Sequence, residues 1–579
     1  MDHDAAHQPP RGIKRLSLGA LSGLLAGYAA IAVAELVSAA VRPESGPVIA
    51  VGGAAIDRTP PAVKDWAIQH FGTNDKLVLQ LGILAVLTVL ALVLGAFATR
   101  RRLLGSLGVL AFGVVGALAA TGRPDSTGVS DAWPSVVGSL AGAGLLYWLV
   151  GRLGPRPAPP APATAPGTAT TTTTATGTTT TTATDVEEAP GAHPATTPGA
   201  NSATTPGTGS AADGGQGWDR RGFILAATAA AAASTGAGLG GRALNSSQGR
   251  GAVASRDAVV IPAPTSAAAP VPRGAALRVK DISPFMTPNG DFYRVDTALV
   301  VPKVDATDWR LRIHGDGVDR ELTVSYADLL KMPLIERNIT LTCVSNEVGG
   351  PYVGNARWIG VRLADLLKRC GVRPPSRGGP ADQLVARSVD GMTIGSPVED
   401  VMDGRDAMLA LGMNGKPLPF EHGFPVRMVV PGLYGYVSAC KWIQDIELTT
   451  FDAYDSYWVK RDWARRAPIK TESRIDTPKP FGRPKSGTVM VAGVAWAQHR
   501  GIDKVEVRVD DGPWEEARLA TEDTRDTWRQ WSYPWQAAKG GHTLTVRATD
   551  RTGRTQTEKR TPTIPDGASG WHSVVVTVD

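Results

Sequence analysis

The chain has 579 residues, three cysteines and a formal net charge of +6. A single hydrophobic core rarely grows beyond roughly 250 residues, so several structural units are expected. The odd number of cysteines excludes a disulfide scaffold, and the basic residues flank apolar segments instead of forming a stripe with aromatic side chains. Nucleic acid is therefore not an expected partner.

Four apolar runs occur in the first part of the chain, at 18–40, 77–98, 103–120 and 136–150. Most approach the roughly 20 residues that a helix needs to cross a bilayer, so residues 1–153 are predicted to form a four-helix transmembrane region. Basic clusters precede the first run and separate the second from the third, whereas residues 45–56 and 125–134 contain no Lys or Arg. The positive-inside rule then places the N-terminus, and the chain after the fourth run, in the cytoplasm.

Residues 154–217 consist mostly of Thr, Ala, Pro and Gly, with little apolar surface to offset the entropy of ordering. This composition predicts a disordered cytoplasmic linker. In the segment 218–244, Arg220 and Arg221 stand directly before a weakly apolar, Ala-rich run. The pair is consistent with a twin-arginine export signal or with the cytoplasmic flank of a fifth transmembrane helix. Both interpretations place the chain after about Asn245 outside.

A second linker is predicted at 245–275, followed by mixed strand and helix patterns over 276–455 that indicate an α+β domain. In this domain WIGVRLADLLKRCGV predicts a helix closed by Gly371, and both Cys370 and Cys440 are interpreted as packing residues. Residues 456–579 form the last predicted domain, whose short, regularly spaced strands indicate an immunoglobulin-like all-β sandwich. The predicted fold class is therefore α+β, with helices before it and a sandwich after it.

Cys343 lies in LTCVSNEVGG, where a β-branched run meets Asn346, Glu347 and two glycines. A cysteine on a strand is more often a packing residue than a chemical one. Together with ARWIGVRLADLL and MNGKPLPFEHGFPVRMVVPGLYGYVSACKWI, however, the stretch resembles the sulfite oxidase family of molybdopterin enzymes. The resemblance extends over about 282–579, and the C-terminal strands look like the dimerisation domain of that family.

The resemblance implies a molybdenum–molybdopterin cofactor, with Cys343 as the metal ligand and catalytic residue. A deprotonated, soft thiolate suits a metal that already carries sulfur ligands. Arginine and lysine suit the phosphate of the pterin, and glycines allow backbone amides to approach it. The other residues that the resemblance assigns to the cofactor are Tyr293, Arg294, Asp296, Thr297, Asp390, His422, Arg427, Ser438 and Lys441.

The activity that the family implies is oxygen-atom transfer between water and a substrate, with molybdenum cycling by two electrons. Glu347 lies near the position where sulfite oxidases have an arginine, and a carboxylate there would repel sulfite. The basic residues 460, 461, 465 and 466 either replace that arginine or form a linker between domains. Reduction of a sulfoxide-type substrate on the same fold is the main alternative.

No CxxCH haem motif and no cysteine cluster for an iron–sulfur centre occurs in the sequence. An external electron partner, a cytochrome or a quinone-linked protein, is therefore expected. A homodimer is implied by the resemblance alone, and the expected location is the cell membrane, multi-pass, with the catalytic domain extracytoplasmic. A non-enzymatic membrane-anchored receptor or adhesin is the alternative of another class, which a cytoplasmic Thr-rich segment disfavours.

Overall fold

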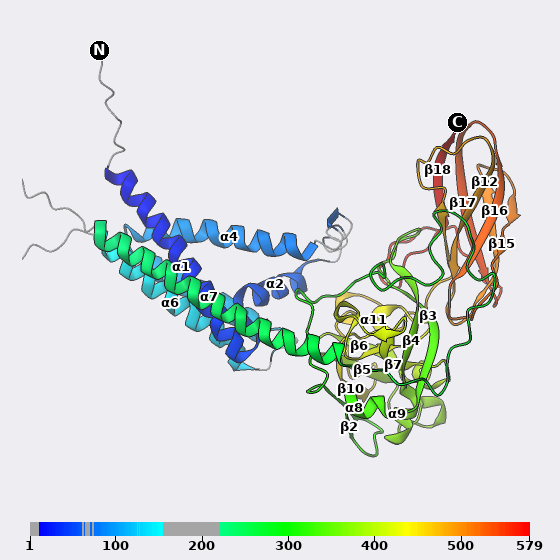
Figure 1. Ribbon diagram of the computed structural model, residues 1–579, viewed down its shortest axis with the longest axis horizontal. Coiled ribbons are helices and arrows are strands. Elements are labelled where there is room, and N and C mark those ends of the chain that lie inside the picture. The colour runs from blue at the N-terminus through cyan, green and yellow to red at the C-terminus, as the bar shows by residue number, and fades with distance from the viewer. Residues whose placement is uncertain are drawn as a thin grey trace, which may run out of the picture.

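A bundle of long helices is joined to two β-rich units in the computed structural model (Figure 1). The structure describes residues 11–60, 63, 66, 70–71, 75–123, 126, 128–153 and 220–579. The linker predicted at 154–217 lies outside the described residues.

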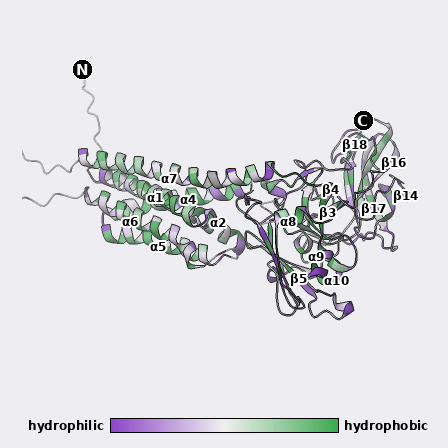
Figure 2. Ribbon diagram, turned by 60° about the horizontal axis from the view of Figure 1, so that its bottom comes forward, coloured by the Kyte–Doolittle hydropathy of each residue, from purple (hydrophilic) through white to green (hydrophobic). Residues whose placement is uncertain are grey.

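Among the described residues, five helices are long and apolar enough to cross a membrane. They are α1 (Arg11–Val41), α4 (Asp75–Ala98), α5 (Arg102–Thr121), α6 (Trp133–Gly151) and α7 (Arg220–Asp257). Figure 2 shows hydrophobic residues along the whole bundle, and large apolar side chains such as Leu81, Val89 and Leu118 are exposed on it. Exposed apolar side chains on helices of this length suit contact with lipid.

Glycine residues let the helices of the bundle approach closely. A Cβ atom on Gly23 of α1 would lie 2.0 Å from the Ala91 carbonyl oxygen of α4, and one on Gly95 would lie 2.2 Å from the Gly19 carbonyl oxygen. Close packing of this kind stabilises helix pairs in lipid, where burial of apolar surface provides no driving force. The small residues of α1 and α4 therefore contribute to the packing of the bundle, in addition to its apolar residues.

The bundle differs from the prediction at two places. A short helix, α2 (Pro47–Arg58), follows the 3-10 turn η1 (Pro43–Ser45) in the loop after the first apolar run. In addition, α7 continues to Asp257, so the linker predicted from residue 245 begins only after that residue. Arg256 donates to the carbonyls of Pro417 (3.0 Å) and Leu418 (2.7 Å), and these contacts hold a sequence of weak helix propensity in the helix.

The α+β unit contains two sheets, one in the order β2-β1-β10-β5-β6 and one in the order β3-β4-β7-β8, with β9 also paired to β7. The pairing of β1 with β10 is parallel, and the other pairs in these sheets are antiparallel. The strands are β1 (Arg310–Gly315), β2 (Leu322–Ser325), β3 (Leu334–Thr342), β4 (Val353–Arg362), β5 (Gln383–Ser388), β6 (Thr393–Pro397), β7 (Met408–Met413), β8 (Lys416–Pro417), β9 (Arg427–Val429) and β10 (Ile443–Thr449).

Short helices connect these strands: α8 (Tyr326–Leu330), α9 (Leu363–Arg369), α10 (Val398–Met402) and α11 (Gly435–Ser438). α9 ends before Gly371, which has φ +85°, and Cys370 is buried in the core, as the sequence predicts. The same core includes Trp463, Ala467 and Ile469, so the chain just after the boundary predicted at 455/456 packs with the α+β unit.

The C-terminal unit consists of two antiparallel sheets, β11-β12-β16-β15 and β14-β13-β17-β18, around a second core that includes Val505, Trp531 and Val576. Its strands are β11 (Glu472–Thr477), β12 (Gly487–Trp496), β13 (Ile502–Val509), β14 (Trp514–Glu516), β15 (Arg518–Leu519), β16 (Arg529–Ala537), β17 (Gly540–Asp550) and β18 (His572–Val578). Figure 1 shows this unit at the end of the molecule that lies away from the bundle.

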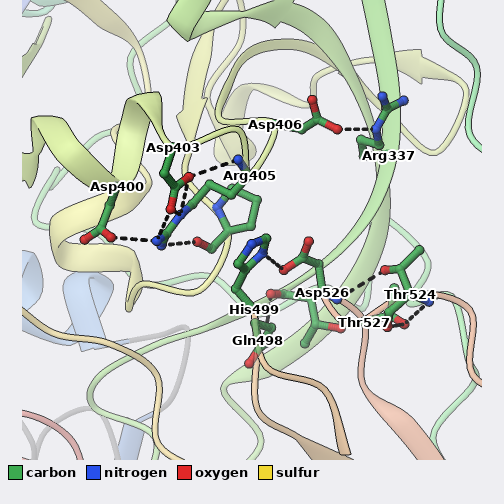
Figure 3. Close-up of polar contacts among 12 residues, drawn as sticks. Arg337, Asp400, Asp403, Arg405, Asp406, Gln498, His499, Thr524, Asp526 and Thr527 are labelled. Atoms are coloured by element: carbon green, nitrogen blue, oxygen red, sulfur yellow. Dashed lines mark hydrogen bonds and ion pairs between the residues drawn. The ribbon is translucent and has the colours of Figure 1, made fainter. Parts of the chain in front are cut away.

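The C-terminal unit also holds β3, the strand that leads to Cys343. Gln498 donates through Nε2 to the Thr340 carbonyl (2.9 Å) and to Thr342 Oγ1 (3.2 Å). The Thr340 N–H donates to the Asp526 carbonyl (2.9 Å). Figure 3 shows Gln498 beside His499, whose ring contacts the Asp526 carboxylate at 2.9 Å. The end of β3 is therefore tied to both β-rich units.

Candidate cofactor site

Cys343 is the first residue after β3 and lies in the wall of a cavity of about 330 Å³. Its N–H donates to the Tyr352 carbonyl (2.9 Å), and its own carbonyl accepts from the Asn346 N–H (3.1 Å). The Asn346 side chain accepts in turn from the Tyr352 N–H (2.7 Å). The three cysteines form no disulfide with one another. The turn that presents the Cys343 sulfur is therefore fixed by hydrogen bonds among Cys343, Asn346 and Tyr352.

The paired glycines after this turn allow it to pack against the C-terminal unit. Gly349 has φ +79°, and a Cβ atom there would lie 2.2 Å from the His572 ring of β18. The Gly350 carbonyl accepts from Arg474 of β11 (2.7 Å). A larger residue at 349 would push the turn away from the sheet, so the GG pair serves the position of Cys343.

Seven of the ten residues that the sequence assigns to the cofactor line this cavity. They come from five separate places in the chain, which only the fold brings together: Tyr293, Asp296, Thr297, Cys343, Asp390, Arg427 and Lys441. Asp390 lies between β5 and β6, and burial raises the pKa of its carboxyl. Burial likewise raises the pKa of the Tyr293 phenol, so its hydroxyl is available as a hydrogen-bond donor.

Arg427 supplies a buried positive charge to the cavity. Its Nη1 donates weakly to the His422 carbonyl (3.4 Å), and its guanidinium lies 5.3 Å from the centre of the Trp358 ring. Its Nε is buried and has no hydrogen-bond partner among the described residues. A buried cation with an unsatisfied donor is costly unless an anion completes its contacts. The site thus favours a ligand that carries negative charge.

A second charged cluster centres on Asp296. Its Oδ2 contacts Lys441 Nζ (2.8 Å) and Arg294 Nε (2.9 Å), and its Oδ1 pairs with Lys76 at the start of α4. Burial opposes ionisation of Asp296, but these cations outweigh it and hold the pKa of its carboxyl far below the usual range. Burial also lowers the pKa of Lys441 to about 8, although Asp296 acts in the opposite direction. Three cations share one carboxylate, which leaves a positive surplus.

Three predicted residues lie outside the cavity lining. Arg294 points to Asp296, Ser438 donates to the Leu433 carbonyl (2.9 Å), and the His422 ring contacts the Asn289 carbonyl through Nε2 (3.0 Å). Burial and the neighbouring Arg427 lower the pKa of His422 to about 4, so the neutral ring donates from Nε2. Their contact with a cofactor stays a prediction.

Gly423, next to His422, explains part of the HGFPVR motif. It has φ +109°, and a Cβ atom there would lie 3.2 Å from the Lys441 Cα. Glycine therefore allows the chain before Arg427 to pass directly beside the backbone of Lys441. The two cationic residues, 14 positions apart in the sequence, are brought to the same wall by this contact.

Glu347 does not act as the sequence suggested. Its side chain is exposed and it is not part of the cavity lining, so its charge does not face the space beside Cys343. Val344 and Ser345 still line the cavity, whereas Gly349 and Gly350, after Glu347, contact the C-terminal unit. Repulsion by Glu347 is therefore not an argument against an oxyanion substrate.

The basic residues at 460–466 also lie outside the cavity lining. Arg461 lies 3.6 Å from the centre of the Tyr457 ring, and Arg465 pairs with Asp455 (3.0 Å). The two tryptophans among them, Trp458 and Trp463, do line the cavity. Of the two alternatives for this segment, a basic connection between domains fits better than a substrate-binding cluster.

The structure adds lining residues that the sequence did not suggest. Cys440, interpreted as packing, borders the cavity with its sulfur buried, and burial raises the pKa of its thiol. Five residues come from the N-terminal region: Ile56, Thr59, Val63, Lys76 and Leu79. No local pattern announces them, because they reach the cavity only through the docking of the bundle on the α+β unit.

Comparisons with known proteins agree with the position of this site. A profile of the oxidoreductase molybdopterin binding domain matches residues 298–458. Mitochondrial sulfite oxidase of Rattus norvegicus is 31% identical over 288 residues, which cover 43% of this chain and 52% of that protein. The uncharacterized oxidoreductase YuiH of Bacillus subtilis (strain 168) is 32% identical over 162 residues, covering 28% of this chain and 75% of that protein.

Among solved structures, the sulfane dehydrogenase SoxCD from Paracoccus pantotrophus is similar, with a TM-score of 0.44, 25% identity and coverage of 51% of this chain and 83% of that chain. The chain spans about half the length of the mitochondrial sulfite oxidases that it matches. Matches to oxidoreductases do not fit the alternative of a non-enzymatic receptor or adhesin.

The residues around the cavity fit a molybdopterin cofactor. The unsatisfied Nε of Arg427 and the positive surplus around Asp296 suit the phosphate of a pterin. Gly435 borders the cavity, and a Cβ atom there would lie 4.0 Å from the Tyr293 hydroxyl oxygen, within the space available to a ligand. The Cys343 side chain in the wall provides the soft donor that such a metal requires.

Proposed function

Because the chain belongs to the sulfite oxidase family of molybdopterin-dependent oxidoreductases, we propose that it is a membrane-anchored enzyme that transfers an oxygen atom between water and a sulfur compound. The observation that carries this proposal is the cationic cavity with Cys343 in its wall and the unsatisfied Arg427 donor beside it. Sulfite, a small oxyanion, is the first substrate to test.

Each residue of the site has a proposed role toward the cofactor. Cys343 would ligate the metal as a thiolate, and Arg427 and Lys441 would bind the phosphate and the pterin edge by charge-assisted hydrogen bonds. The bound molybdopterin supplies a metal centre that exchanges two electrons and an oxygen atom, which no side chain can do. The remaining predicted contacts are Tyr293, Arg294, Asp296, Thr297, Asp390, His422 and Ser438.

The membrane helices are proposed to anchor the enzyme with residues 154–217 on the cytoplasmic side and the α+β unit outside. The charge bias of the sequence supports this orientation, as does the course of α7, which runs from the far end of the bundle to the α+β unit (Figure 1). Electrons would be exchanged with an external cytochrome or quinone-linked partner. The C-terminal unit is proposed to be an immunoglobulin-like domain that joins two copies of the chain.

Reduction of a sulfoxide-type substrate is a second candidate, favoured by a specific observation. The cavity is bordered by Trp458, Trp463 and Tyr436, whereas the basic residues at 460–466 lie elsewhere. Aromatic walls suit an uncharged substrate with an alkyl group better than they suit a small dianion. Only the direction of oxygen transfer and the electron partner would differ from the first proposal.

The proposal is tested with the full-length chain, purified in detergent from a host that synthesises molybdopterin. We expect about one molybdenum per chain, and oxidation of sulfite with an artificial acceptor or reduction of methionine sulfoxide with an artificial donor. A Cys343→Ala variant controls for contaminating activity. Molybdenum without either activity would contradict a sulfur substrate, and the absence of molybdenum would contradict the cofactor assignment.

A further inference from the structure

The wall of the cavity that faces the bundle is built by the N-terminal region. Ile56 and Thr59 come from the end of α2, Lys76 and Leu79 from the first turns of α4, and Val63 from the chain between them. The matched oxidoreductase domain begins only at residue 298, so these residues belong to a different part of the chain. The cavity is thus shared between the α+β unit and the membrane region.

Lys76 makes a polar contact across this boundary. It pairs with Oδ1 of Asp296, whereas Lys441 and Arg294 contact Oδ2. The Asp296 side chain is 3% exposed and the Lys76 side chain 17%, so the ion pair is largely removed from solvent. Ion pairs in such surroundings are weakly screened, so the charge of Lys76 acts on Asp296 and its other partners.

A second contact attaches the end of α2 to the α+β unit beside the cavity. Tyr457 donates to the Asp57 carboxylate (2.6 Å), and Arg461 donates to the Asp57 carbonyl (3.4 Å) while lying over the Tyr457 ring. Tyr457 directly precedes Trp458, which lines the cavity. The membrane region is therefore held to the α+β unit at two places beside the cavity.

The charges explain what Lys76 contributes. Without it, Lys441 and Arg294 would be the cations that compensate Asp296, and Lys441 also lines the cavity. With Lys76 on Oδ1, the cluster carries one more positive charge than Asp296, Lys441 and Arg294 carry by themselves. A phosphate-bearing ligand in a poorly solvated space is stabilised by that surplus.

We propose that the membrane region completes the cofactor site and that Lys76 is a positioning residue for the cofactor. It neutralises Asp296, so that the Lys441 ammonium remains available to the anionic pterin, while the ends of α2 and α4 cover the cavity. This inference rests on the molybdopterin assignment, and it gives the bundle a role in cofactor retention beyond anchoring.

The test compares full-length Lys76→Met with Lys76→Arg and with Lys303→Met, a matched control at an exposed lysine outside the cavity. Molybdenum and pterin per chain are measured after purification and again after prolonged dialysis, and melting temperatures are recorded without cofactor. We expect retention in Lys76→Met to fall about tenfold, with Lys76→Arg and Lys303→Met close to the unchanged chain. Melting temperatures of the cofactor-free proteins should differ little.

Two further variants separate positioning from general damage. In an Asp296→Asn background, Lys76→Met should have no additional effect, because the carboxylate that it neutralises is gone. Tyr457→Phe, which removes the second attachment, should lower retention by a smaller factor. Equal retention in Lys76→Met and the unchanged chain would overturn the proposal while leaving the cofactor assignment intact. If the unchanged chain held no molybdenum, both would fail.

Discussion

Cys343 illustrates how a residue of an ordinary type acquires a special position. All three cysteines are buried, but Cys370 lies within the α+β core, whereas Cys343 follows the end of a strand and borders the cavity. Its backbone is held by Tyr352 and Asn346. Burial does not distinguish the thiols of Cys343 and Cys370, but their positions relative to the cavity do.

Cys343→Ala is expected to lose molybdenum to the background level, because the soft thiolate that would hold the metal is removed. Cys370→Ala is the matched control: it removes a buried sulfur from the core, should cost about 1 kcal/mol of stability and should keep the metal. Metal analysis and thermal unfolding of both full-length variants check this. Full metal content in Cys343→Ala would contradict the ligand assignment.

Arg427→Met is expected to have opposite effects on binding and on stability. Since Nε of Arg427 is buried without a partner among the described residues, the variant without cofactor should melt at a higher temperature, by an amount equivalent to about 1 kcal/mol or more. Its cofactor content should fall, because the guanidinium that would bind the phosphate is gone. Arg427→Lys keeps the positive charge but loses the two parallel donors of the guanidinium, so its cofactor content should lie between those of Arg427→Met and the unchanged chain. A variant that kept its cofactor would remove Arg427 from the site.

At the scale of elements, the strands beside the cavity depend on the C-terminal unit. β3 is tied to it through Gln498 and Asp526, and the turn after β3 packs on β11 and β18. β11 in turn contains Glu472, which is buried and accepts from Gln556 Nε2 (3.3 Å). Destabilisation of the C-terminal unit is therefore expected to disturb β3 and the turn that carries Cys343.

Glu472 predicts a pH dependence of stability. Burial raises its pKa from about 4.5 to about 8, against the opposing effect of Lys470 and Arg560. Between these two pKa values the native state binds more protons than the unfolded state. The contribution of Glu472 to the free energy of unfolding is therefore complete below about pH 4.5 and is lost as the pH rises through about 8. The slope is about 1.4 kcal/mol per pH unit at its steepest.

Glu472→Gln should remove this slope and raise the melting temperature at pH 8 relative to the unchanged chain, because the neutral amide is never forced to ionise. Thermal unfolding from pH 5 to pH 8.5 measures it, with Glu515→Gln on the exposed face of the same unit as the control. A variant whose profile ran parallel to that of the unchanged chain would show that Glu472 is not the titrating group.

At the scale of the whole molecule, the bundle and the two β-rich units form one continuous arrangement. α7 leads from the bundle into the α+β unit and is fixed there by Arg256, while α2 and α4 contribute to the cavity wall. With the bundle in a membrane, as proposed, its apolar surface (Figure 2) would place the cavity close to the membrane surface. An electron partner that reaches this site is expected to act near the membrane.

The orientation gives a prediction of its own. In spheroplasts, an epitope inserted within residues 160–215 should be protected from external protease, and one placed after Asp579 should be removed. A cytoplasmic enzyme serves as the control for membrane integrity. Cleavage of the inner epitope in intact cells would reverse the orientation.

The sequence by itself determined the elements whose signals are local. Apolar runs of membrane length predicted α1, α4, α5 and α6, and strand patterns predicted the β-rich units. HGFPVR and LTCVSNEVGG carried much of the resemblance to the family, and seven of the residues that this resemblance assigned line the cavity. Only the tertiary structure decided what depends on distant contacts. Lys76 and Asp296 are 220 residues apart, Glu347 is exposed outside the cavity lining, and α7 is extended by docking. Such contacts depend on how folded units pack against one another, and this packing produces no periodic pattern of apolar residues in the sequence.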